Sequence, residues 1–144
     1  SFLILPPKDV RYFTFSFIHH LSLEDVRDQE EFDKHYVFLS ELFNDAYLCA
    51  HNARFDIGVL NAMCDRYHLK HFKNYYSLSR QIFDLPNHKL NTVCQALEVS
   101  LNHHEAGSDA YGCLMIVLRA MEVLGEYDID KVLKKTAVYL AHNK

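Results

Sequence analysis

The sequence contains no run of lysine or arginine, no pair of cysteines at C-x-x-C spacing and no long uninterrupted apolar stretch. Its net charge is −4, so it lacks the basic stripe of proteins that wrap a duplex non-specifically, and any contact with nucleic acid should be local and short. No charged-then-apolar leader is visible, and we expect neither a signal peptide nor a membrane partner.

The four cysteines are widely spaced, and each lies in an apolar stretch: Cys49, Cys64, Cys94 and Cys113. This pattern favours buried thiols in a reducing compartment over a disulfide framework. We therefore expect a cytoplasmic protein.

Hydrophobic periodicity indicates strands that alternate with helices, which is typical of an α/β domain. The strand-like segments are SFLILPP (1–7), RYFTFSFI (11–18) and AYLCA (46–50). A short helix should begin at the capping-box spacing of Ser22 to Asp25. Another should follow the turn at Pro86-Asn87 and end at Leu97. The remaining helical segments are 31–43, 55–69, 109–124 and 129–141. These strands are few for an α/β domain with so many helices, so the predicted sheet is small.

AHNARFD (50–56) joins a buried strand to a helix. Asp56 falls in the first turn of that helix, where the helix dipole and free N–H groups favour a carboxylate. One interpretation is structural, with Asp56 as helix-start chemistry and Asn52 as the N-terminal cap. The other is functional, because α/β folds place ligand sites where strands end and helices begin.

LNHHEAGSDA (101–110) places His104 five positions before Asp109. In one continuous helix these two side chains would not share a face, but Gly107 and Ser108 favour a loop that carries His104 and a helix that starts near Asp109. A loop histidine beside a fixed carboxylate can accept and release a proton near neutral pH. The alternative is that His103 and His104 are loop surface and that Asp109 is a helix-start acid.

Together, HNARFD, LPNHKLNTVCQAL and HHEAGSDA resemble the DEDDh family of 3′→5′ exonucleases, and the proofreading epsilon subunit of bacterial DNA polymerase III most closely. FIHHLSLEDV (17–26) resembles the family's earlier histidine-containing segment, although His20 stands where a glycine is usual. The resemblance runs from about residue 2 to about residue 118. It implies a ribonuclease-H-like α/β fold, with a central mixed sheet flanked by helices.

The resemblance also implies a metal centre. Asp109 matches a direct metal ligand, Asp56 matches a carboxylate that holds the second ion through water, and His104 matches the general base. Two Mg²⁺ or Mn²⁺ ions suit such carboxylates and can activate a water for attack on a phosphodiester.

On the substrate side, the resemblance places Ile18, His19 and Phe55 against the terminal nucleotide. Asn52 belongs to the same group of substrate-side residues and supports the strand end rather than touching metal. The implied partner is a single-stranded or frayed DNA 3′ end, met during proofreading or repair, with a DNA polymerase subunit as a possible companion.

The family's first motif, aspartate-x-glutamate on the opening strand, has no match before AHNARFD, because Asp9, Glu24, Asp25 and Asp28 all lie in loop-like or helical sequence. SFLILPP resembles the family's third strand, so the leading strands are missing. We first expect residues 1–144 to be a single exonuclease domain that is incomplete at its N-terminus, a reading that the initial Ser1 favours, with 128–144 as an extra helix outside the resemblance.

Three alternatives remain open. The chain can be a truncated piece, or a catalytically inactive exonuclease-fold binding module that lacks its principal metal ligands. It can also be an α/β interaction domain whose acids are helix caps, in which case the loss of Asp109 would cost roughly 1 kcal/mol of stability.

Overall fold

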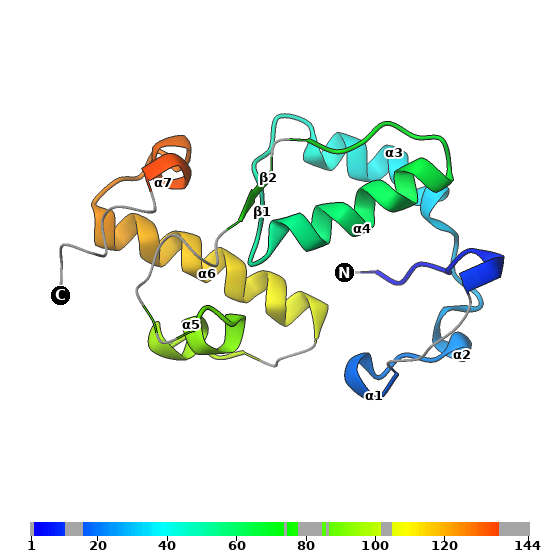
Figure 1. Cartoon of the computed structure of the whole chain (residues 1–144), viewed down its shortest axis with the longest axis horizontal. Helices are drawn as coiled ribbons and strands as arrows, with labels where there is room; N and C mark the ends of the chain where they lie inside the picture. Colours follow the sequence, from blue (N-terminus) through cyan, green and yellow to red (C-terminus); the bar gives the residue numbers. More distant parts are fainter. Residues whose placement is uncertain are drawn as a thin grey trace. The chain divides into compact units, whose positions relative to one another are not determined.

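The structure is a computed structural model, and it describes residues 2–10, 16–73, 75–77, 85, 87–101 and 105–135. The chain divides into two compact units (Figure 1). Unit 1 consists of Ser1–Ala46 and Gly58–Lys73, and unit 2 of Tyr47–Ile57 and Asn74–Lys144. Within these described ranges, no helix is both long enough and apolar enough to cross a membrane.

Unit 1 contains a 3₁₀ turn (Lys8–Val10), α1 (Ser16–His19), α2 (Leu23–Val26), α3 (Phe32–Phe43) and most of α4 (Ala53–Arg66). The predicted capping box is confirmed, because the Asp25 carboxylate accepts the Ser22 backbone N–H at 2.7 Å at the start of α2. Aromatic rings fill the interior: Phe32 is buried, and its ring centroid lies 6.3 Å from that of Tyr67.

Of two predicted strands in this unit, one is wrong in its described residues and the other is wrong for residues 16–18. Residues 2–7 of SFLILPP form no strand; the Leu5 N–H donates to the Glu30 carbonyl at 2.9 Å, and the Pro7 carbonyl accepts the Val10 N–H at 3.0 Å. In RYFTFSFI, residues 16–18 belong to α1 and residues 11–15 lie outside the described part of the chain. Apolar alternation alone does not make a strand, since a strand also needs a partner edge to bond with.

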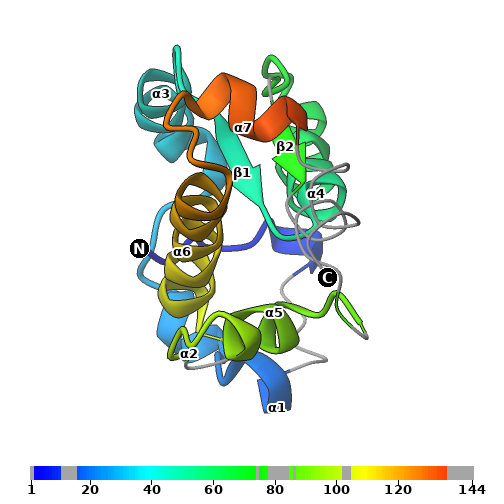
Figure 2. The ribbon, with the colours of Figure 1, turned by 90° about the vertical axis from the view of Figure 1, so that its left-hand side faces the viewer.

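Unit 2 contains β1 (Leu48–Ala50), β2 (Tyr75–Ser77), α5 (Leu90–Ala96), α6 (Ala106–Leu124) and α7 (Ile129–Lys135). The two strands are parallel and in register, so that Leu48 pairs with Tyr75 and Ala50 with Ser77. Their carboxyl ends therefore meet at one edge (Figure 2). In the described ranges this pair is the whole sheet, as thin as the sequence predicts, and the predicted α/β class is confirmed.

A second core lies among the three helices of unit 2. Its buried members are Val93 and Cys94 of α5, Ile116, Val117 and Ala120 of α6, and Val132 and Leu133 of α7. At the end of α6, Gly125 adopts φ = +60°, the left-handed conformation that terminates helices and that glycine accepts at least cost. The described part of α7 is thus a component of this core, while residues 136–144 lie outside the described part.

Candidate active site

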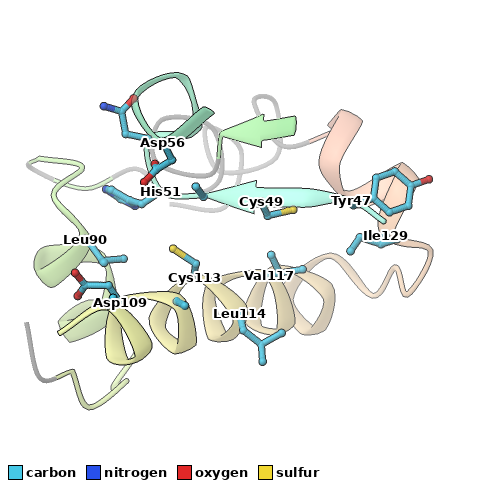
Figure 3. Close-up of a pocket in the computed structure, with 14 residues that line it drawn as sticks. Tyr47, Cys49, His51, Asp56, Leu90, Asp109, Cys113, Leu114, Val117 and Ile129 are labelled. Atoms are coloured by element: carbon cyan, nitrogen blue, oxygen red, sulfur yellow. The ribbon is translucent and has the colours of Figure 1, made fainter. Parts of the chain in front are cut away.

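A pocket of about 650 Å³ lies in unit 2, between β1 and α6 (Figure 3). One end is polar, with His51 and Asn52 after β1, Asp56 on α4 and Asp109 on α6. The other end is apolar and is lined by Tyr47, Cys49, Leu114, Val117 and Ile129. The two carboxylates, far apart in the sequence, therefore share one pocket.

The start of α4 is held by the neighbouring strand. The Ser77 hydroxyl, at the end of β2, donates to the His51 carbonyl at 3.2 Å and accepts the Ala53 N–H at 3.3 Å. The Asn52 carbonyl accepts the first helical bonds, from Phe55 at 2.8 Å and Asp56 at 3.4 Å. Asp56 is thereby fixed in the first turn at the carboxyl end of the sheet.

The start of α6 is capped by Glu105. Its carboxylate accepts the N–H groups of Gly107 at 3.1 Å and Ser108 at 3.2 Å, and its carbonyl accepts the Asp109 N–H at 2.9 Å. Two of the helix's unpaired donors are satisfied in this way. Asp109 is therefore not the N-cap of α6, and its side chain lines the pocket instead.

Burial and neighbouring charge act on the titratable groups of the pocket. Although Asp56 keeps part of its surface open to solvent, desolvation raises the pKa of its carboxyl, opposed by its backbone hydrogen bond and by His51. Desolvation lowers the pKa of His51, and raises the pKa of the Cys113 thiol to about 11. At neutral pH Cys113 is a neutral thiol beside two acids.

A sequence model of the family described as Exonuclease, the RNase T family, matches residues 13–117. The chain belongs to this exonuclease family. Since the family match covers most of the chain, the predicted family and the predicted ribonuclease-H-like fold are confirmed.

Several curated relatives of this chain are DNA polymerases III of the PolC type. The one from Halalkalibacterium halodurans is 37% identical over 59% of this chain, and the one from Bacillus cereus is 34% identical over 62%. The one from Caldanaerobacter subterraneus is 32% identical over 69%. The chain spans 6–8% of the length of these three relatives. No solved structure matches the chain.

The structure brings together three of the predicted site residues: Asp56, Asp109 and Asn52 line the same pocket. Phe55 is 67% exposed and is not among the residues that line it. Ile18 and His19 lie on α1, in unit 1. His104 lies outside the described residues. The roles of all seven residues remain predictions.

His51 and Cys113 are pocket residues to which the sequence gave no role. His51 directly follows β1, and its position beside Asn52 was the available signal. Cys113 stands four positions after Asp109 on α6, a spacing that places both on one helix face. The apolar surroundings of Cys113 in the sequence indicated burial and gave no hint of a pocket.

The donor chemistry of the pocket suits part of a site for a hard divalent cation. Asp56 and Asp109 supply carboxylate oxygens, which Mg²⁺ and Mn²⁺ prefer. In the part of the chain that the structure describes, no three histidine, cysteine, aspartate or glutamate residues form a potential metal cluster. The two carboxylates therefore suit such an ion but supply only part of the ligands that it needs.

Proposed function

We propose that this domain is a metal-dependent exonuclease that hydrolyses phosphodiester bonds at DNA 3′ ends in the 3′→5′ direction. The supporting observation is the convergence of Asp56 and Asp109, each from the first turn of its helix, on one pocket at the carboxyl end of β1. Glu105 caps α6, so Asp109 is not needed for that task. The sequence match to the exonuclease family supplies the reaction class.

Asp56 and Asp109 are the proposed ligands of Mg²⁺ or Mn²⁺. When bound, such ions lower the pKa of a water and neutralise charge at the scissile phosphate. His104, assigned from the family resemblance, would accept the proton of the attacking water. Ile18, His19, Asn52 and Phe55 are proposed to contact the terminal nucleotide.

A DNA 3′ end is the proposed substrate because the curated relatives are DNA polymerases III. Proofreading or repair beside a polymerase is the corresponding role. The net charge of −4 suits an enzyme that holds a few terminal nucleotides rather than a long duplex.

The test uses full-length protein and a single-stranded oligonucleotide labelled at its 5′ end. We expect a ladder that shortens from the 3′ end, disappears with chelator and returns with Mg²⁺ or Mn²⁺. Asp56→Asn, Asp109→Asn and His104→Asn should each lose at least about 100-fold in rate, the upper range for groups that merely support metal ligands.

Asp65→Asn on α4 and Glu122→Gln on α6 are the matched controls, since both acids lie on the same helices outside the pocket. Cleavage that resists chelation, or that starts from the 5′ end, contradicts the proposal. DNA binding without cleavage would indicate the inactive binding module instead.

A further inference from the structure

The imidazole of His51 has two distinct surroundings in the pocket. Its Nε2 atom lies within hydrogen-bonding distance of the His88 carbonyl oxygen. Because a carbonyl oxygen accepts and cannot donate, Nε2 must carry the proton. The Nδ1 atom is buried and has no partner among the described residues. The ring therefore acts as a fixed donor to the His88 carbonyl.

This bond joins two parts of unit 2. His51 stands in the turn between β1 and α4, whose backbone is held by Ser77. His88 directly precedes the N-cap of α5. The bond thus links the turn that leads to Asp56 with the entry of α5.

The entry of α5 is in turn packed on α6. Leu90 and Cys94 of α5 face Gly112 of α6 so closely that an added Cβ there would lie 3.0 Å from the Cys94 sulfur and 3.7 Å from Leu90 Cδ1. Asp109 stands on the same helix, one turn before Gly112. The two helices are therefore closely packed one turn after Asp109.

We infer that His51 is a positioning residue that sets the separation between the carboxylates of Asp56 and Asp109 through its hydrogen bond to the His88 carbonyl. This inference rests on the proposed function, in which both carboxylates serve one metal centre. His51 transfers no proton in this role. Without the bond, α5 and the first turns of α6 move away from the strand end, and the two acids no longer face one pocket.

The variants are His51→Gln, whose side-chain amide can still donate to the carbonyl, and His51→Leu, which cannot. The matched control is His71→Ala, a histidine of unit 1 that pairs with Asp65. The first readout is amide hydrogen exchange in metal-free full-length protein, followed at Val93 and Asp109, whose N–H groups bond to Lys89 and Glu105.

We expect faster exchange at both amides in His51→Leu, with His51→Gln and His71→Ala close to the parent. The second readout is Mn²⁺ binding, which His51→Leu should weaken by about 10- to 100-fold and His51→Gln by much less, as for other groups that orient metal ligands. A split between KM and kcat then separates a loss of metal from a loss of DNA contact.

Unchanged exchange in His51→Leu overturns the inference, whatever the activity. Equal effects of His51→Gln and His51→Leu at both amides also overturn it, because the donated hydrogen bond would then not matter. If exchange changes as expected while the parent neither binds Mn²⁺ nor cleaves DNA, positioning by His51 stands and the proposed function fails.

Discussion

The two acids at the start of α6 should have opposite effects when each is removed. Loss of Glu105 should mainly lower stability, and loss of Asp109 should mainly lower cleavage. Glu105 accepts two backbone N–H groups as the N-cap, and Asp109 stands in the first turn with its side chain in the pocket. Glu105→Ala should lower the free energy of unfolding by about 1 kcal/mol, the usual value of an N-cap. In a chain of this size that corresponds to a fall of roughly 3 °C in melting temperature.

Asp109→Asn removes a charge near the positive end of the helix dipole, an effect of roughly 0.5 kcal/mol at an accessible site. We therefore expect it to be the milder change for stability, while it abolishes cleavage. Glu105→Ala should retain most of the cleavage at temperatures where the protein is folded. Replacing Glu105 should therefore cost more stability, whereas replacing Asp109 should cost more cleavage activity.

Chemical denaturation of the two full-length variants and the 5′-labelled oligonucleotide assay supply both measurements. Glu105→Gln is the control, since its amide oxygen can still accept a backbone N–H while the charge is gone. The reasoning is refuted if Asp109→Asn costs more stability than Glu105→Ala, because Asp109 would then be the structural acid of this helix.

Gly58→Ala should stabilise α4 by about 1 kcal/mol through helix propensity, since nothing lies within 4 Å of the added Cβ. Gly112→Ala should instead destabilise the protein by about 1–3 kcal/mol through overpacking, because its Cβ would lie 3.0 Å from the Cys94 sulfur. Chemical denaturation of both variants checks that the two changes in the free energy of unfolding have opposite signs. Burial raises the pKa of the Asp56 carboxyl above its ordinary value of 3.8, so the folded state binds a proton there more readily than the unfolded state does. The free energy of unfolding should therefore rise as the pH falls from above the folded pKa toward 3.8. Asp56→Asn should therefore be slightly more stable than the parent at pH 7 and lose this advantage in acid. Burial and Glu31 raise the pKa of Tyr67 to about 12, so Tyr67→Phe should remove one tyrosine from the last phase of a spectrophotometric titration.

The long helices were predictable because each carries its own apolar stripe. The predicted helix 31–43 is α3, and the predicted 109–124 is α6, which starts at Ala106. That earlier start could not be read from hydrophobicity, because Glu105 sets it by accepting N–H groups of Gly107 and Ser108. A helix-start acid was one of the two sequence interpretations of Asp109; the hydrogen bonds show that the N-cap of α6 is Glu105, with Asp109 in the first turn.

The strands were less predictable because pairing depends on distant residues. AYLCA was recognised from its apolar run and contains β1, whereas Tyr75–Ser77 is too short to show alternation and becomes β2 through its register with Leu48–Ala50. SFLILPP has the composition of a strand and forms none in residues 2–7. The described sheet therefore follows available backbone partners more than local propensity.

At the polar end of the pocket, some features could likewise be predicted from local sequence and others depend on distant residues. Asp56 and Asp109 could be selected one at a time, since each follows a recognisable helix-start pattern. Their convergence depends on β1 and β2 ending at one edge, and on Ser77 and His51 holding the turn beside it. Ser77 carries no pattern that distinguishes it from an ordinary polar residue, and the signal for His51 was its position beside Asn52 after the strand. The acids proposed to bear the chemistry are therefore visible in the sequence, whereas the residues proposed to hold them together become visible through hydrogen bonds.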